Sequence, residues 1–273
     1  MRVPASRWTI LRPDVPAPSA NSSASSPFAL EARHLCLSWD GEHEVVHDVS
    51  LAVATAETVC MVGRSGCGKT TILHALSGLL KPMSGTVLVH GQESTAEPGH
   101  VSYMFQKDLL LPNKRILDNV CLPLVIAGAS REEAFKKARP LLSRFGLTGT
   151  ESLWPSELSG GMRQRAAFLR TYLLGTDVML LDEPFSALDA ITRKDLRQWF
   201  SKTSRDLGIA SLMITHDVDE AVAMARRIYV LGGKPSQIVG EVTVERPSDP
   251  KETDFELTDA FIAAKREVLS LLN

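Results

Sequence analysis

The sequence predicts an α/β protein built around a mainly parallel sheet, and three observations support this fold class. From residue 58 onward, short apolar runs alternate with stretches of helical spacing, which is typical of a parallel sheet covered by helices on both faces. One of these runs, Thr58 to Val62, leads directly into a glycine-rich loop that opens a helix. Before it, the alternating segments 35–37 and 45–53 are typical of an antiparallel sheet.

Composition favours one full globular core and argues against a nucleic-acid-binding protein and against a membrane-spanning one. The chain has 273 residues, of which 44% are hydrophobic, enough for an α/β domain with a subdomain. Its 30 basic and 32 acidic residues nearly balance, so no global basic field favours nucleic acid, and we expect no nucleic-acid partner. The longest apolar stretches, such as Val120 to Ala129, are far shorter than the roughly 20 residues of a membrane-spanning helix. Because the opening residues also lack the apolar core of a secretory signal, we expect a cytosolic chain.

Local patterns place the elements of the first half. Residues 1–27 are rich in proline, serine and alanine without a hydrophobic period, so we expect a disordered leader. After the glycine-rich loop, residues 70–80 have a helical pattern that ends at the turn residues Lys81-Pro82. Residues 86–90 and 100–105 then have the pattern of strands.

Residues from about 107 to 160 change character, because their main periodic segments, 116–126 and 131–145, are both helical. Ser130 and Glu133 predict a capping box at the start of the second of these helices, and Pro140 should bend or end it. Beyond this region the pattern predicts helices at 161–174, 190–206 and 218–225, and strands at 178–181 and 210–215. Near the C-terminus, one helical face carries Leu257, Phe261, Ala264, Val268 and Leu271, and we expect it to pack on its own domain rather than on a partner.

The glycine-rich loop reads Gly-Arg-Ser-Gly-Cys-Gly-Lys-Thr from Gly63 to Thr70. Its glycines let consecutive backbone N–H groups curl around a phosphate at a helix N-terminus, while Lys69 neutralises charge on the β- and γ-phosphates. The Thr70 hydroxyl should coordinate Mg²⁺, and Thr71 should add a phosphate contact. Arg64, Ser65, Gly66, Cys67 and Gly68 complete the predicted nucleotide-binding set. By itself the loop predicts binding of a nucleoside triphosphate and leaves the class of enzyme open.

A second motif narrows the class of nucleotide-binding enzyme. Leu158 to Arg165 reads Leu-Ser-Gly-Gly-Met-Arg-Gln-Arg and resembles the signature of ATP-binding-cassette (ABC) proteins. Other elements of that family follow in order, and the resemblance extends from about residue 30 to 240. They are Trp39, Gln106 in Tyr-Met-Phe-Gln, Met179 to Pro184, Ser186 to Asp189, and Ile214 to Asp217. The resemblance implies a phosphate-loop ATPase core with a mainly parallel sheet, an antiparallel β subdomain and an inserted helical subdomain at about 107–160. We expect the ATPase domain at 28–245 and a helical extension at 246–273.

The resemblance also assigns the hydrolytic residues. Asp182 follows an apolar strand, so its carboxylate should reach the carboxyl edge of the sheet and hold Mg²⁺ directly or through water. Glu183 is implied as the general base that polarises the attacking water, and His216 as the γ-phosphate sensor that orients it. Gln106 should contact Mg²⁺ or the water and link the core to the helical subdomain. Trp39 stands where the family places an adenine-stacking aromatic residue, usually tyrosine; the alternative is that it is only packed.

The signature residues Ser159, Gly160, Gly161 and Gln164 have a different implied role. Ser159 to Gly161 should form a helix N-terminus that suits an anion, although Lys69 already serves the ATP of the same chain. The family resolves this by forming a head-to-tail homodimer, in which the signature of one subunit contacts the ATP of the other. Asp189 would then lie at the seam between subunits.

As a function, the resemblance implies the ATPase subunit of a bacterial importer at the cytoplasmic face of the inner membrane. Its partners would be integral membrane permease subunits and, indirectly, an extracytoplasmic substrate-binding protein. The segments Phe105 to Pro112 and Thr215 to Ala221 resemble the nitrate, sulfonate and taurine branch, which includes importers of the pyrimidine precursor of thiamine. Two alternatives stay open: a soluble ABC-type ATPase that acts on nucleic acid or ribosomes, and the ATPase subunit of an exporter.

The four cysteines, Cys36, Cys60, Cys67 and Cys121, have neither metal-ligand spacing nor the density of a disulfide framework. We therefore expect buried thiols, with Cys67 in the phosphate loop as the exception.

Overall fold

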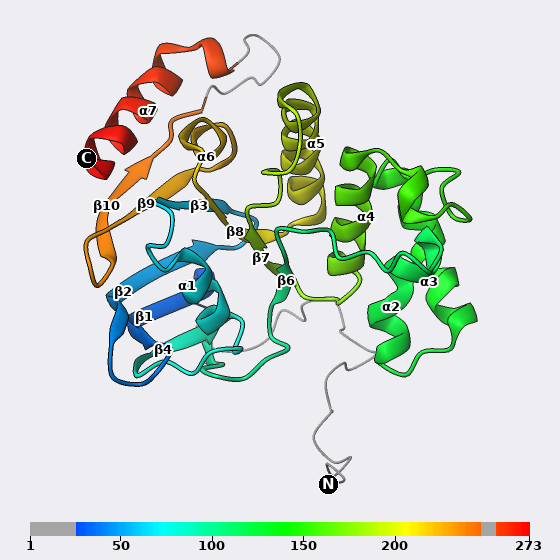
Figure 1. Cartoon of the computed structure of the whole chain (residues 1–273), viewed down its shortest axis with the longest axis horizontal. Coiled ribbons are helices and arrows are strands. Elements are labelled where there is room, and N and C mark those ends of the chain that lie inside the picture. The colour runs from blue at the N-terminus through cyan, green and yellow to red at the C-terminus, as the bar shows by residue number, and fades with distance from the viewer. Residues whose placement is uncertain (1–25, 247–254) are drawn as a thin grey trace, which may run out of the picture. The chain divides into compact units, whose positions relative to one another are not determined.

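The computed structural model describes residues 26–246 and 255–273 and divides the chain into two compact units (Figure 1). We call Ser25–Lys107 with Asp177–Asn273 the core unit, and Asp108–Thr176 the helical unit. The predicted leader falls, up to residue 25, outside the described residues. Among the residues that are described, no helix combines the length and the apolar character needed to cross a membrane.

The first sheet of the core unit is antiparallel, as the alternating segments predict, with strand order β2-β1-β4-β5. Leu35, Leu37, Val46 and Val49 are completely buried on its inner face. The register between its two long strands is irregular at several points, including the end next to their connection, where Leu37 pairs with Val46 but Ser38 pairs with Glu44. The strands are β1 (Phe28–Ser38), β2 (Glu44–Ala54), β4 (Ser84–Val89) and β5 (Gln92–Glu93).

The second sheet is the mainly parallel one, in the order β10-β9-β3-β8-β7-β6, and only its β10–β9 pair is antiparallel among the described strands. Because β3, β8, β7 and β6 are parallel neighbours, their carboxyl ends meet at one edge, where ligands bind in open α/β sheets. The strands are β3 (Thr58–Gly63), β6 (Ser102–Met104), β7 (Val178–Asp182), β8 (Ala210–Thr215), β9 (Arg227–Gly232) and β10 (Gln237–Thr243).

Helix α1 (Lys69–Leu76) packs between the two sheets, against β1 on one side and β3 and β7 on the other (Figure 1). It ends at Leu76, so the predicted end at residue 80 was wrong. The reason lies at Gly78, whose φ is +76° and where a Cβ would lie 2.4 Å from the carbonyl carbon of Glu97. The chain must turn there to let the two backbones approach.

The other helices of the core unit are α5 (Ala190–Leu207), α6 (Val218–Met224) and α7 (Asp259–Leu272). Helix α7 packs on α6, β9 and β10 through buried Phe261, Ala264 and Val268, which confirms that the C-terminal apolar face serves its own domain. Leu257 was wrongly placed on this face: it lies in the 3-10 turn Phe255–Leu257 and is 78% exposed.

The helical unit contains α2 (Ile116–Ile126), α3 (Arg131–Arg144), the 3-10 turn Pro155–Glu157 and α4 (Gly160–Tyr172). It extends beyond the predicted residue 160 because α4 packs against α2. The capping box of Ser130 and Glu133 is confirmed. Pro140 does not end α3; it lies on the exposed face, where water can satisfy the Lys136 carbonyl that loses its N–H partner.

Candidate nucleotide-binding and hydrolysis site

The phosphate loop joins β3 to α1 in the predicted strand–loop–helix order. Gly66 and Gly68 have φ angles of +76° and +91°, which side-chain-bearing residues rarely adopt. A Cβ at Gly63 would lie 2.6 Å from the Cys67 Sγ, so glycine is also needed where the loop closes on itself. Helical hydrogen bonding begins with Ile72 N–H donating to the Gly68 carbonyl at 3.0 Å. The preceding N–H groups therefore face out of the helix end, as anion binding requires.

Lys69 places its ammonium group inside this loop. Its Nζ donates to the Gly63 carbonyl at 2.9 Å and to the Arg64 carbonyl at 3.1 Å, and the residue is 6% exposed. The positive charge is thus fixed where a phosphate would meet the loop N–H groups. The Arg64 side chain points elsewhere, donating to the Leu272 carbonyl at the end of α7 at 3.1 Å. This direction fits a nucleotide contact through the Arg64 backbone alone.

Trp39 follows β1 directly and is 61% exposed, so its ring offers a free face at the rim of the antiparallel sheet. The Trp39 ring forms a T-shaped contact with His74 of α1, with 5.9 Å between the ring centroids, and the His74 centroid lies 5.8 Å from that of Tyr103. The exposure does not suit the alternative of a merely packed ring. Stacking of adenine on Trp39 stays a prediction.

Asp182 lies at the carboxyl end of β7 and is held by two hydroxyl groups. Tyr103 Oη donates to its Oδ2 at 3.0 Å, and the Thr70 side chain is also hydrogen-bonded to it. Burial raises the pKa of Asp182, and the nearby Glu183 carboxylate raises it further. The hydrogen bond from Tyr103 lowers the pKa, but the net shift is upward. Hydroxyl and carboxylate oxygens are the ligands that Mg²⁺ prefers, so the donor set of Thr70 and Asp182 fits that ion.

Glu183 is the centre of a cluster that joins three strand ends. Its Oε2 lies 3.0 Å from His216 Nδ1 and accepts a hydrogen bond of 3.2 Å from Gln106 Nε2. The three residues follow β7, β8 and β6, which are neighbours in the sheet. Glu183 has a φ of +43°, and its N–H donates to the Ile214 carbonyl at 3.0 Å, so the turn after β7 is tied to the adjacent strand. The structure therefore brings together the three predicted hydrolytic side chains.

Two residues of this cluster were missed by sequence reasoning. Ser186 Oγ accepts from Gln106 Nε2 at 3.2 Å and donates to the Glu183 carbonyl at 3.0 Å, bracing both. Tyr103 supports Asp182 as described above. The only signal for Tyr103 was a hydroxyl-bearing residue on the strand that ends near Gln106. For Ser186 it was the step of three residues from Glu183, which allows a turn contact.

The signature residues lie in the helical unit. Ser159 caps α4, its Oγ accepting from Met162 N–H at 3.3 Å, and Gly160 and Gly161 form the first turn, so the predicted helix N-terminus is present. Gln164 is 6% exposed, and its Oε1 has no hydrogen-bond partner among the described residues. In the core unit, Asp189 caps α5 by accepting from Thr192 N–H at 3.0 Å, and this hydrogen bond lowers the Asp189 pKa.

Comparisons with known proteins agree with this arrangement. The sequence profile of the ABC transporter family matches residues 46–186. The formylaminopyrimidine import ATP-binding protein ThiZ of Halalkalibacterium halodurans is 37% identical over 250 residues, covering 89% of this chain and 96% of the relative. The nitrate import ATP-binding protein NrtD of a Synechocystis species is 37% identical over 237 residues, covering 85% of this chain and 89% of the relative.

A solved structure shares the fold as well. The dimeric post-hydrolysis state of the ATP-binding cassette MJ0796 bound to ADP and Pi superposes with a TM-score of 0.67 at 27% identity, covering 80% of this chain and all of that one. The geometry of the site agrees with the family match and with the relatives. The chain belongs to the ABC transporter family, as a subunit that binds and hydrolyses ATP.

Proposed function

We propose that Glu183 is the general base of ATP hydrolysis, oriented by His216 and Gln106. The observation that carries this proposal is the position of one carboxylate oxygen, Glu183 Oε2, within 3.2 Å of Gln106 Nε2 and 3.0 Å of His216 Nδ1. A base must be held within one hydrogen bond of the water that it deprotonates, and two polar partners fix this oxygen in one direction.

The remaining roles follow from what phosphoryl transfer needs, which is positioning and charge neutralisation. Lys69 and the loop N–H groups bind the β- and γ-phosphates, Thr71 adds a contact in the first helical turn, and Trp39 stacks on adenine. Thr70 and Asp182 would hold Mg²⁺, with Gln106 beside them, and the ion would neutralise charge on the phosphates. Glu183 accepts the proton of the attacking water, and His216 contacts the γ-phosphate.

We further propose that two copies close head to tail on two ATP molecules. Ser159, Gly160, Gly161 and Gln164 of one subunit would meet the γ-phosphate held by the other, and Asp189 would lie at the seam. The N-terminus of α4 supports this, because its N–H groups attract anions although they belong to the helical unit and not to the phosphate loop. The dimeric MJ0796 structure with ADP and Pi offers a precedent in the family.

The transport role that we propose is import of a small solute through separate integral membrane permease subunits, with an extracytoplasmic binding protein delivering the cargo. The subunit would work at the cytoplasmic face of the inner membrane. Relatives of similar identity are named for import of formylaminopyrimidine and of nitrate, so their names support an importer and not one cargo. The candidates are a thiamine pyrimidine precursor and a nitrate-, sulfonate- or taurine-like anion. An exporter subunit and a soluble ATPase are the competing functions.

Replacing Glu183 with glutamine tests the chemistry and the partners together. Glu183→Gln should bind ATP, fail to hydrolyse it and accumulate as a closed dimer, detected by light scattering with and without ATP. The matched control is Glu93→Gln, an exposed carboxylate on β5, which should hydrolyse ATP like the unmodified protein. A Glu183→Gln protein that is monomeric with ATP and fully active would overturn both the base and the dimer.

The same tagged variant identifies the partner when captured from native membranes in mild detergent. Co-purification of a polytopic permease supports the transporter, and its binding protein can then be screened for cargo. Ribosomal or DNA-repair proteins without any permease would overturn the transport role and leave the nucleotide chemistry standing.

A further inference from the structure

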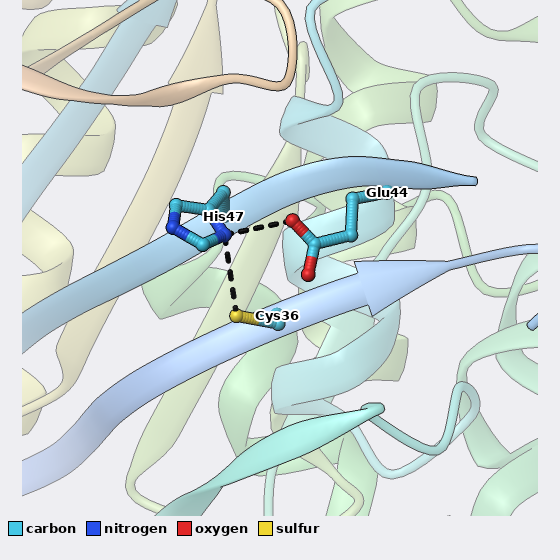
Figure 2. Close-up of side chains that lie close together, drawn as sticks. All are labelled: Cys36, Glu44 and His47. Atoms are coloured by element: carbon cyan, nitrogen blue, oxygen red, sulfur yellow. Dashed lines mark hydrogen bonds and ion pairs between the residues drawn. The ribbon is translucent and has the colours of Figure 1, made fainter. Parts of the chain in front are cut away.

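Three side chains with metal-ligating atoms, none of them assigned to ATP, meet on the antiparallel sheet. Cys36 belongs to β1, and Glu44 and His47 belong to the neighbouring β2 (Figure 2). His47 Nδ1 lies 2.7 Å from Glu44 Oε2 and 3.8 Å from Cys36 Sγ. One ligand atom from each residue falls within 4.8 Å of the other two, the only such group of three among the residues in the described ranges.

The local fold explains why these side chains converge. Leu35, Leu37 and Val46 point into the core and are completely buried, so the intervening Cys36 and the adjacent His47 lie on the outer face. One step along β1, from Leu37 to Ser38, corresponds to two steps along β2, from Val46 to Glu44, so β2 contains an extra residue there. This bulge brings Glu44 to the same face as His47, three residues further along the strand. The carboxylate, the imidazole and the thiol can therefore reach one point.

We propose that Cys36, Glu44 and His47 form a binding site for a divalent ion of the zinc type. In a tetrahedral site with bonds of about 2.3 Å to sulfur and about 2.0 Å to nitrogen or oxygen, neighbouring ligand atoms lie roughly 3.3–3.6 Å apart. The observed separations of 2.7 and 3.8 Å bracket this range, so small side-chain rotations admit the ion. Thiolate and imidazole ligands favour Zn²⁺ over Mg²⁺, which separates this site from the nucleotide's ion.

The surroundings supply the support that a thiolate ligand needs. The backbone N–H of Asp48 donates to Cys36 Sγ at 3.4 Å, the kind of second contact that orients a ligand atom and stabilises its charge. Glu44 and His47 are exposed and Cys36 is half-buried, so an ion can enter from solvent and keep water in the fourth position.

The site also spans the base of the hairpin that carries Trp39. The connection between β1 and β2 runs from Ser38 to Glu44. The ion would link Cys36 of β1, before this connection, to Glu44 and His47 of β2, after it. On the inner face of the same hairpin, a Cβ at Gly68 of the phosphate loop would lie 2.9 Å from Val46 Cγ2. Ion binding would therefore restrict the hairpin next to the nucleotide. This consequence rests on the proposed adenine contact of Trp39, whereas the site itself does not.

The test is direct metal binding to the full chain. The protein is stripped with a chelator and titrated with Zn²⁺ by calorimetry and with Co²⁺ by absorption, since a Co²⁺–thiolate bond gives a charge-transfer band. We expect one ion per chain and a thiolate band, with the band lost in Cys36→Ser and the Zn²⁺ affinity lowered at least about tenfold in His47→Gln and Glu44→Gln. Because the thiol must lose its proton, affinity should also fall as the pH is lowered.

Two controls keep the outcome clear. His34→Gln removes an exposed histidine of the same sheet that pairs with Asp48, and Cys67→Ser removes the half-buried thiol of the phosphate loop. Both should keep the thiolate band. A band that survives in Cys36→Ser, or no saturable binding of either ion, would overturn the site. Neither result bears on ATP hydrolysis, which is measured separately by the Glu183→Gln experiment.

Discussion

The Glu183 carboxylate and the His216 imidazole lie 3.0 Å apart, and they belong to turns that follow two neighbouring strands, β7 and β8. The contact uses Nδ1 of His216, so the opposite ring nitrogen, Nε2, is the atom that can face a phosphate. The glutamate side chain is 19% exposed and that of the histidine is 60% exposed, which places the ring on the solvent side of the carboxylate.

Replacing His216 with alanine should slow hydrolysis while ATP binding is retained. The Glu183 carboxylate, our proposed base, would lose one of its two polar partners, and loss of such orientation costs roughly 10²-fold or more in rate. Single-turnover hydrolysis and equilibrium binding of a fluorescent ATP analogue separate the two effects. His100→Ala, which removes an exposed histidine paired with Glu97, is the control and should leave both measurements unchanged. An equal loss of affinity in both variants would contradict the role of His216.

Tyr103→Phe should raise the Mg²⁺ concentration needed for half-maximal ATPase activity. The phenol donates to Asp182, and without it the half-buried carboxylate loses its fixed orientation, at a cost of about 1 kcal/mol. The phenylalanine ring can still pack against Phe105, whose centroid lies 4.6 Å from that of Tyr103. Thermal unfolding of the variant reports the structural cost separately. An unchanged Mg²⁺ requirement would show that Tyr103 does not position Asp182.

Alkylation of Cys67 should block nucleotide binding through bulk in the phosphate loop. The Cys67 Sγ lies 4.0 Å from Lys69 Nζ, so an added group would occupy the space of the phosphates. Burial raises the pKa of the Cys60 and Cys121 thiols, that of Cys121 to about 11, which leaves Cys36 and Cys67 as the reactive pair.

The measurement is ATP binding after treatment with an alkylating reagent, with the modified residue identified by mass spectrometry. A Cys67→Ser protein, in which Cys36 is the remaining reactive thiol, should bind ATP before and after treatment. Full modification of Cys67 with retained ATP affinity would refute the steric argument.

Glu57→Gln should destabilise the fold by about 2 kcal/mol at neutral pH, because it removes the better-buried carboxylate partner of Arg227 and leaves the more exposed Glu241 as its remaining acidic partner. Arg227 donates to both carboxylate oxygens of Glu57 at 2.8 Å, and Ala54 N–H donates to one of them at 2.8 Å. Burial pushes the Glu57 pKa upward, but these hydrogen bonds outweigh it and the pKa is lowered overall.

The sign of the pH dependence follows from that lowered pKa. The stabilisation is present above the ordinary glutamate pKa of about 4.3 and is lost as the pH falls through the lowered value of Glu57. Urea unfolding at neutral and acidic pH should therefore show a smaller acid-induced loss in Glu57→Gln. Glu241→Gln removes the more exposed partner of Arg227 and should cost less than about 1 kcal/mol. Equal effects of both variants would contradict the assignment.

Features that depend on neighbours along the chain could be predicted from the sequence. The strand, glycine loop and helix around Lys69, and the capping box of Ser130 and Glu133, each use residues a few positions apart. The Glu183 cluster was also predicted, because a parallel sheet brings the ends of its strands to one edge and the family resemblance named the residues.

Features set by contacts between distant segments were missed. The hydrogen bond of Tyr103 to Asp182 depends on the β6–β7 register, and the early end of α1 depends on the Glu97 backbone beside Gly78. Cysteine spacing gave no sign of the Cys36 cluster because its ligands come from two strands with an irregular register. The continuation of α3 through Pro140 depends on that residue being exposed, which helix propensity alone does not report.

The backbone passes between the core unit and the helical unit twice, after Lys107 and after Thr176. The first passage follows Gln106, just after the carboxyl end of β6. The second leads into the amino end of β7, the strand that pairs with β6 at one edge of the sheet. The phosphate loop follows β3, which β8 separates from β7. A pull from the helical unit would thus reach the strands behind Gln106 and Glu183 before it reached Lys69. The backbone therefore joins the helical unit directly to the two strands whose carboxyl ends precede Gln106 and Glu183, and not to the strand that precedes Lys69.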